Sequence, residues 1–312
     1  MPGKIMDSGL DGWTPDRLDD LTGRRYFITG GNAGLGFETA KFLRAASADV
    51  IIGCRSATKA DAAVAELEML SGAGSVGSIP IDLADTGSIR AGVDQLRETV
   101  DGLDAIVNNA GVMQTPQRET ADGFELQFGT NHLGHFLMNQ LAFDLVAARG
   151  GRIVPVSSVA HLRGDLHFDD VMLSTNYSPT RAYSQSKLAN LVYGLELARR
   201  VAAAGSDVTS VTAHPGYAAT NLQSTGPTGL MRVFYKFTNA VMAQPAERGA
   251  VPLVLAAAGD GARNGGYYGP TSMGGARGPV GDAAATDTAT DPENGRRLWE
   301  LSEDLLGIEF EI

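Results

Sequence analysis

Short apolar segments alternate with helical patterns from residue 24 to about residue 270. The segments that we expect to form strands are residues 25–29, 50–54, 76–81, 104–108, 152–157, 207–213 and 266–269. Apolar residues at helical spacing fall between them, at residues 34–47, 57–70, 86–100, 120–148 (one helix or two), 180–203 and 246–258. Such alternation predicts an α/β fold, doubly wound, in which a seven-stranded and mostly parallel sheet has helices on both faces.

The pattern has no internal boundary. No charge run or Pro/Ser-rich linker divides it, so we expect residues 1–312 to form a single domain. Its core would be residues 24–270, preceded by an N-terminal extension, residues 1–23, and followed by a C-terminal segment, residues 271–312.

Both terminal segments carry local signals. Thr14 and Pro15 stand in the order of an N-cap and a first-turn proline, which predicts a short helix ending near Gly23. Residues 270–295 are rich in Gly, Ala, Thr, Asp and Pro, and we expect an irregular surface segment there. Leu residues at helical spacing then predict a helix over residues 296–306 that docks on the body.

A glycine-rich turn follows the first strand of the core. It reads Gly-Gly-Asn-Ala-Gly-Leu-Gly over residues 30–36, and a helical pattern comes directly after it. Bare backbone amides at a helix N-terminus can hold a pyrophosphate, so this turn predicts a dinucleotide site. The G-x-x-x-G-x-G spacing differs from the common G-x-G-x-x-G. A literal G-x-G-x-x-G at residues 72–77 lies between a helix and a strand, the wrong order for phosphate binding, and we interpret it as a connection.

Tyr183 and Lys187 stand four residues apart in a predicted helix. Residues at this spacing lie on one face, where their side chains can share a site. A phenol has a pKa near ~10 and is a poor acid or base at neutral pH, but a neighbouring cation favours the phenolate. The pair therefore indicates a general acid/base, although most such pairs are solvated helix faces.

Several motifs in this order resemble the short-chain dehydrogenase/reductase family over residues 24 to about 270. Their spacing and strand-end positions match the Rossmann fold of that family. The stretches at residues 130–136 and 183–200 resemble its retinol dehydrogenase and WW-domain oxidoreductase branch. The motifs are Thr29-Gly30-x-x-x-Gly34-x-Gly36, Asn108-Asn109-Ala110-Gly111, a serine upstream of Tyr183, and Tyr183-x-x-x-Lys187.

The resemblance implies four catalytic residues. Tyr183 would be the general acid when a carbonyl is reduced, and the general base when an alcohol is oxidised. Lys187 would lower the tyrosine pKa and bind the nicotinamide ribose. Ser158 would hydrogen-bond the substrate oxygen, with Ser157 as its rival, and Asn131 would hold a water that links Lys187 to solvent.

The resemblance also implies a cofactor site. Asp82 would bind the adenine amine, Pro215 and Gly216 would line the nicotinamide pocket, and Thr220 would reach the carboxamide. The residues that we expect to contact the dinucleotide are Gly30, Asn32, Ala33, Gly34, Leu35, Gly36, Arg55, Lys59, Asp82, Leu83, Asn109, Ala110, Gly111, Tyr183, Lys187, Pro215, Gly216 and Thr220.

Position 55 bears on the choice of cofactor. An acidic residue about ~20 residues past the glycine turn would accept hydrogen bonds from the adenosine ribose and mark NAD. Here that position is Arg55, whose guanidinium would pair with a 2′-phosphate, and Lys59 would add charge. We therefore predict NADP(H) as the cofactor, with NAD(H) as the alternative. Arg55 could also be a solvated residue at a strand end without a role in cofactor binding.

Composition excludes other classes of protein. A net charge of −11 argues against a nucleic-acid partner, because phosphate neutralisation needs a basic surface. Cys54 is the single cysteine, which fits a reducing compartment, and no apolar run reaches the length of a membrane span, so we expect a cytoplasmic protein. His132 and His135 lack the partners of a known metal motif, so we expect no metal.

The substrate is expected to be a small apolar carbonyl compound or alcohol. The candidate pocket residues Met113, Leu162, Tyr217, Leu222 and Phe234 are mostly apolar, and the glycine-containing stretch at residues 216–230 suggests a lid. The resemblance implies a homodimer or homotetramer formed through the helices at 120–148 and 180–203. A different function of the same fold also stays open, that of an NADPH sensor without turnover.

Overall fold

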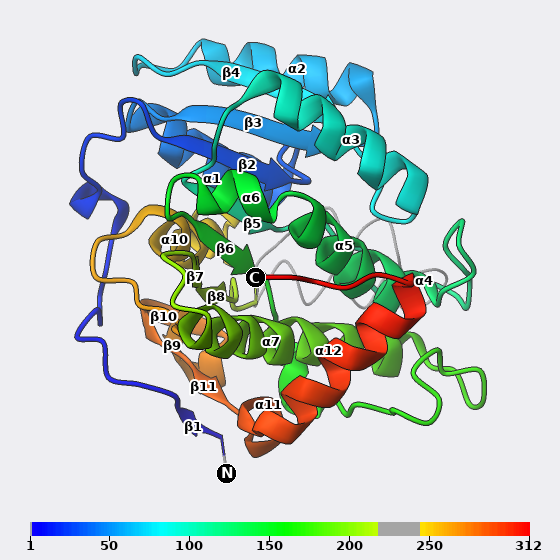
Figure 1. Ribbon diagram of the computed structural model, residues 1–312. Coiled ribbons are helices and arrows are strands. Elements are labelled where there is room, and N and C mark those ends of the chain that lie inside the picture. The colour runs from blue at the N-terminus through cyan, green and yellow to red at the C-terminus, as the bar shows by residue number, and fades with distance from the viewer. Residues whose placement is uncertain (1, 218–243) are drawn as a thin grey trace.

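The computed structural model describes residues 2–217 and 244–312, and a parallel six-stranded sheet forms its centre (Figure 1). The strand order is β4-β3-β2-β5-β6-β7, so the chain reverses its direction of winding between β2 and β5. In open α/β sheets a ligand binds at this switch point, beyond the carboxyl ends of the strands. In chain order the strands are β2 (Arg25–Thr29), β3 (Asp49–Cys54), β4 (Val76–Pro80), β5 (Ala105–Asn108), β6 (Arg152–Pro155) and β7 (Thr209–Ser210).

The α/β fold is confirmed, but the prediction of seven strands in one sheet is wrong in its count. The expected strand at 207–213 is divided at Val211 into β7 and β8 (Thr212–Ala213). β7 pairs with β6, whereas β8 pairs in parallel with β9 (Tyr267–Ser272), and β10 (Arg277–Asp282) adds to β9 antiparallel. These three strands form a second sheet, which a bridge between Val156 and Ala213 joins to the end of β6.

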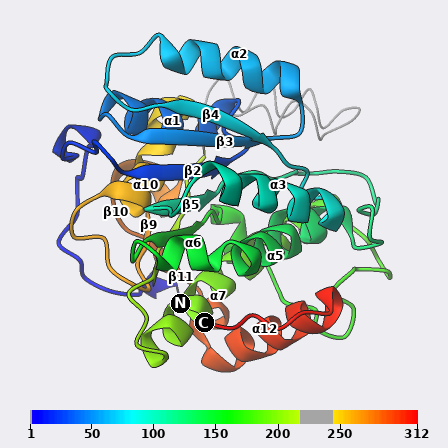
Figure 2. The same cartoon turned by 45° about the horizontal axis from the view of Figure 1, so that its top comes forward.

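Helices cover both faces of the parallel sheet. Alternate strand residues face opposite sides, so that Phe27, Ile51 and Ile106 pack in one core and Ile28, Ile52 and Val107 in the other. In Figure 2, α3 and α5 lie on one side of the sheet, and α1 and α10 lie on the other. The main helices are α1 (Gly34–Ala45), α2 (Ala57–Glu68), α3 (Thr86–Thr99), α5 (Gly134–Leu141), α7 (Pro179–Ala203) and α10 (Ala246–Ala258).

The segment predicted to be helical at 120–148 is made of shorter pieces. α4 (Leu126–Phe128) begins after Glu125, whose carboxylate accepts the backbone N–H groups of Gln127 and Phe128 at 3.0 and 2.7 Å. A π-helical turn, Gly129–Leu133, leads into α5, and α6 (Phe143–Ala147) follows. The π turn widens the helix at Asn131, one of the predicted site residues.

The two terminal segments pack against each other. Pro15–Arg17 forms a 3₁₀ turn after Thr14, so the short N-terminal helix ends well before Gly23, where we expected its end. Trp13 is buried and forms a bridge with Val280 of β10. β1 (Gly3–Lys4) pairs with β11 (Ala284–Ala285), and α11 (Asp287–Thr290) follows. The expectation of an irregular segment over residues 270–295 is therefore wrong.

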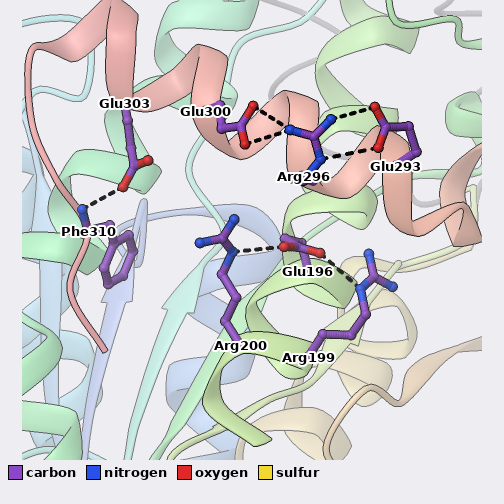
Figure 3. Close-up of polar contacts among 8 residues, drawn as sticks. All are labelled: Glu196, Arg199, Arg200, Glu293, Arg296, Glu300, Glu303 and Phe310. Atoms are coloured by element: carbon purple, nitrogen blue, oxygen red, sulfur yellow. Dashed lines mark hydrogen bonds and ion pairs between the residues drawn. The ribbon is translucent and has the colours of Figure 1, made fainter. Parts of the chain in front are cut away.

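The predicted C-terminal helix is confirmed as α12 (Pro292–Leu306), which lies alongside α7 (Figure 1). Figure 3 shows ion pairs within each helix: Arg296 contacts Glu293 and Glu300 on α12, and Glu196 contacts Arg199 and Arg200 on α7. These pairs are partly exposed and contribute little to stability.

Phe310, near the C-terminus, packs against other aromatic side chains. The Phe310 ring lies 4.9 Å from Trp299 and 5.4 Å from Phe136, measured between centroids, and the Phe310 N–H donates to Glu303 at 2.7 Å. The guanidinium of Arg200 covers the Trp299 ring at 4.3 Å. None of the helices in the described ranges combines the length and apolar character needed to span a bilayer.

Candidate active site

A cleft of about 780 Å³ lies beyond the carboxyl ends of β2, β3, β5 and β6. Its volume is in the range of small-molecule and cofactor sites. The chain elements that line it are the glycine turn after β2, the ends of β3 and β5, the turn after β6, and the first part of α7. The predicted site residues among the lining are Gly30, Asn32, Ala33, Gly34, Leu35, Arg55, Lys59, Asp82, Leu83, Asn109, Ala110, Gly111, Ser158, Tyr183, Lys187, Pro215 and Gly216.

The glycine turn forms one wall of the cleft. Gly30 has a φ of +65°, and a Cβ there would lie 3.1 Å from Ala110 Cα and from Asn109 Nδ2, so a side chain would be strained and crowded. α1 then begins at Gly34, and its N-cap residue Ala33 supplies no side-chain hydrogen bond to the first turn. The backbone amides of that turn therefore stay available to an anionic group in the cleft.

Gly36 has a packing role in the same turn. It is not part of the cleft lining, and a Cβ there would come within 2.5 Å of both Asn109 Nδ2 and Gly30 O. Asn109 in turn donates from Nδ2 to Thr29 O at 2.8 Å, and Ala110 N donates to Thr29 Oγ1 at 3.0 Å. Gly36 thus lets α1 approach the point where the ends of β2 and β5 are joined.

Two cations line the end of the cleft near β3. Arg55 follows β3 directly, and its Nη1 lies 3.7 Å from Asp82 Oδ2. The Arg55 side chain is 68% exposed, so this ion pair is weak and the guanidinium can turn to another anion. Ser56 caps α2 by accepting the Lys59 N–H, which places the Lys59 side chain at the same end of the cleft.

The two serines after β6 differ in what their hydroxyl groups contact. Ser157 is buried and donates from Oγ to the backbone oxygen of Lys187 at 2.8 Å. Ser158 Oγ accepts the Ala160 N–H at 3.2 Å as the cap of a 3₁₀ turn, Val159–Arg163. Within the described residues the Ser158 hydroxyl proton has no acceptor, so it can be donated into the cleft. This difference favours Ser158 over its rival.

Tyr183 and Lys187 lie on the face of α7 that borders the cleft. Lys187 is buried, its Nζ lies 6.0 Å from the centre of the Tyr183 ring, and it donates to Val156 O at 2.9 Å. Burial lowers the pKa of Lys187 from 10.5 to about 8. The ammonium therefore keeps its charge for most of the time at neutral pH, next to the phenol.

Asn131 lies buried behind the cleft lining, where it hydrogen-bonds to Val112 and Ser186. Its side chain is fully buried and is not part of the cleft lining. Nδ2 donates to Val112 O and to Ser186 Oγ, both at 2.9 Å, and Oδ1 accepts the Val112 N–H at 2.7 Å. The carboxamide thus holds the strand-end segment against α7, and a role in holding water stays a prediction.

The backbone oxygen of Asn131 takes part in a buried chain of hydrogen bonds. Its oxygen lies 3.0 Å from His135 Nδ1, and His135 Nε2 lies 2.9 Å from Thr29 Oγ1. Burial lowers the pKa of His135 to about 4, so the ring is neutral at neutral pH. A carbonyl oxygen only accepts, so Nδ1 carries the proton and Nε2 accepts from Thr29.

His132 is likewise a packing residue. Burial lowers its pKa to about 3, and Nε2 contacts Ser302 Oγ on α12 at 2.9 Å. Among residues 2–217 and 244–312, no three His, Cys, Asp or Glu side chains are placed together as metal ligands would be.

The substrate side of the cleft is partly described. Met113, Leu162 and Tyr217 line it as expected, whereas Thr220, Leu222, Phe234 and nearly all of the proposed lid lie outside the described residues. The sequence reasoning missed Gly274 and Ala276, which reach the cleft from the turn between β9 and β10. Their glycine-rich surroundings indicated a loop, but nothing indicated where that loop lies.

Known proteins resemble this chain over most of its length. The family model described as short chain dehydrogenase matches residues 24–229. Human retinol dehydrogenase 14 is 35% identical over 305 residues, covering 92% of this chain and 88% of that protein. Mouse retinol dehydrogenase 11 is 36% identical over 292 residues, with the same coverage of 92% and 88%.

Two solved structures are also similar. An uncharacterized protein from Mycobacterium paratuberculosis is 37% identical with a TM-score of 0.79, and the match covers 96% of this chain and 100% of that one. A short chain dehydrogenase from Burkholderia cenocepacia, solved in complex with NADP, is 28% identical with a TM-score of 0.62 and coverage of 80% and 96%.

Proposed function

The chain belongs to the retinol dehydrogenase branch of the short-chain dehydrogenase family and is an NAD(P)-dependent oxidoreductase acting on CH–OH or C=O groups, and we propose that it uses NADP(H) and an apolar substrate. The observation that carries the proposal is a single cleft with two chemically different ends. Ser158, Tyr183 and Lys187 line one end, and Arg55 and Lys59 line the other.

The shape of the cleft fits a dinucleotide. The glycine turn offers bare backbone at Gly30 and Gly34 and an uncapped helix N-terminus, which suits a pyrophosphate. Arg55 and Lys59 suit a 2′-phosphate on the adenosine side, where Asp82 and Leu83 also lie. Asn109–Gly111, Pro215 and Gly216 would flank the rest, and Thr220 stays a predicted contact. The nicotinamide would supply or accept the hydride.

The residues of this chain would move and stabilise the proton. Tyr183 would donate its hydroxyl proton to the carbonyl oxygen of the substrate during reduction, and would accept it back during oxidation. Lys187, one of whose three protons is held by Val156 O, would stabilise the phenolate with its charge. Ser158 would donate to the same substrate oxygen and stabilise the developing negative charge.

The apolar side of the cleft supports a hydrophobic ketone, aldehyde or alcohol. Met113 and Leu162 offer hydrocarbon surface there, with Tyr217 as an amphipathic neighbour. NADP usage favours the direction of reduction. We also propose that residues 1–312 act as a single domain in the cytoplasm, which the single cysteine supports. Dimers or tetramers through α5 and α7 stay a prediction.

The test is a screen of NADPH oxidation with ketones, aldehydes and sugars of graded polarity, repeated with Tyr183→Phe. We expect turnover of the apolar carbonyls and a loss of about 10²-fold or more in kcat for Tyr183→Phe, with NADPH binding retained. Turnover of sugars alone would reverse the substrate class. NADPH binding without turnover of any carbonyl would favour the sensor.

A further inference from the structure

A layer of three buried polar side chains lies beneath the catalytic residues. Its members are Ser157, His161 and Tyr267, each about 1% exposed, and we call them the buried polar layer. They come from the end of β6, from the 3₁₀ turn after it, and from β9. Of the three, only Ser157 is part of the cleft lining given by the described residues.

Ser157 connects the layer to Lys187. Its hydroxyl donates to the Lys187 backbone oxygen at 2.8 Å, and its own N–H donates to Ala213 O at 2.8 Å. Lys187 is held a second time at its tip, where Nζ donates to Val156 O. The residue before the proposed catalytic serine therefore fixes the helical turn that carries the ammonium.

His161 connects the layer to Ser158. Its backbone N–H and its ring Nδ1 lie 3.0 and 2.6 Å from the backbone oxygen of Ser158. Since that oxygen only accepts, Nδ1 carries the ring proton, and burial lowers the pKa of His161 and keeps the ring neutral. The 3₁₀ turn that presents the Ser158 hydroxyl is thus locked by a side chain within it.

Tyr267 contacts His161 from β9. Its hydroxyl lies 3.3 Å from His161 Nδ1, and its ring meets His161 edge-on at 5.6 Å between centroids. Since Nδ1 carries the ring proton, the Tyr267 oxygen is the acceptor in this contact. Burial raises the pKa of Tyr267, so the phenol stays protonated.

We propose that Tyr267 is a positioning residue, whose buried hydroxyl holds His161 and, through it, the turn that presents Ser158 to the Tyr183–Lys187 pair. This inference rests on the proposed function, because it assigns Tyr267 a part in the same proton transfer. Ser158 and Lys187 belong to different chain segments: Ser157 holds the backbone of Lys187, and His161, with Tyr267 against it, holds the backbone of Ser158. A small displacement between reacting groups can slow a reaction by up to about 10²-fold, so such coupling bears on rate.

Tyr267→Phe tests the proposal by removing one oxygen atom. We expect kcat to fall between about 10-fold and 100-fold, while the KM values for NADPH and for the carbonyl stay within about twofold. Tyr193→Phe is the matched control. Tyr193, which lies on α7, is likewise a buried tyrosine, and its hydroxyl accepts a hydrogen bond from Asn139 at 2.9 Å, away from the cleft. An equal loss of kcat in both variants, or a kcat within about twofold of wild type for Tyr267→Phe, overturns the proposal.

A double-mutant cycle tests whether the layer acts as a unit. If His161 transmits the effect of Tyr267, the His161→Phe/Tyr267→Phe double variant loses no more kcat than the worse single variant. Independent, multiplying losses contradict the proposal.

Hydrogen exchange separates the failure of this inference from a failure of the proposed function. If wild-type protein reduces no carbonyl, the proposed function fails, but the layer can still be judged without turnover. Amides at residues 158–163 should exchange faster in Tyr267→Phe, and those at residues 195–203 of α7 should not change. Unchanged exchange at residues 158–163 overturns the coupling itself.

Discussion

Replacing Lys187 with methionine should make the protein more stable and inactive. Lys187 is buried, and in the described structure its ammonium has Val156 O as its hydrogen-bond acceptor without a carboxylate beside it. Its pKa falls from 10.5 to about 8 because burial disfavours the charged form. At neutral pH, folding therefore has to bury a charge that water would solvate better. Methionine fills a similar volume without that charge.

The size of the effect follows from the pKa. The difference of 10.5 minus 8 corresponds to about 3 kcal/mol, because one pKa unit is about 1.4 kcal/mol. Losing the hydrogen bond to Val156 O offsets about 1 kcal/mol, and that oxygen keeps the Asn190 Nδ2 donor at 3.1 Å. We expect Lys187→Met to gain about 1–2 kcal/mol, or roughly 2 °C in Tm for a chain of this length.

The pH dependence has a definite sign. Below about pH 8 Lys187 is protonated in both the folded and unfolded states, and the full penalty is present. Between about pH 8 and pH 10.5 the folded state releases this proton first, so the wild-type free energy of unfolding rises with pH through this group. Urea unfolding of both proteins without cofactor, at about pH 7 and about pH 10, measures the gap between them. A variant that is less stable than wild type at about pH 7, or a gap that does not narrow at about pH 10, refutes the reasoning.

Two further changes separate cofactor binding from stability. Arg55→Gln should raise the KM for NADPH by about 10-fold to 100-fold and leave the KM for NADH within about threefold, because only NADPH offers a 2′-phosphate to the guanidinium. Steady-state kinetics with both cofactors would contradict this prediction if the two KM values rose together. Phe310→Ala should lower the free energy of unfolding by about 3 kcal/mol, because it removes the ring that packs on Trp299 and Phe136 and leaves a cavity there. In urea unfolding, a midpoint equal to that of wild type would show that the end of the chain contributes no stability.

Elements with a strong local pattern could be predicted from the sequence. The helix at 246–258 matches α10 to the residue, and the strand at 25–29 matches β2. Where the prediction was wrong, long-range pairing decides the structure. β10 is built from Gly, Pro and Val beside polar residues, and it becomes a strand because Val280 and Asp282 pair with Pro270 and Tyr268 of β9. Nothing in residues 277–282 alone carries that information.

The division of the strand expected at 207–213 has a similar cause. Val211 N still donates to Ile153 O at 3.0 Å, as a continuous strand on β6 would require. One residue later, Thr212 N donates to Gly266 O at 2.8 Å, so the chain leaves β6 and pairs with β9 instead. Apolar patterning indicates that a segment is a buried strand, but it does not indicate which strand will lie beside it.

The residues of the candidate site also fall into two groups: those that a local sequence pattern predicts and those that only long-range packing places. Tyr183 and Lys187 could be paired from the sequence because four residues of helix fix their relative positions, and the glycine turn could be recognised because its chemistry is local. The contact from Tyr267 to His161 spans 106 residues, and a tyrosine at the start of a strand predicts only a packed ring. A short motif can therefore name the groups that do the chemistry. The groups that hold these residues in place can come from distant parts of the chain, and in this fold Tyr267 reaches the site from β9, a strand of the second sheet. If that is correct, substitutions in the buried polar layer will alter kcat while the motif residues and cofactor binding remain intact.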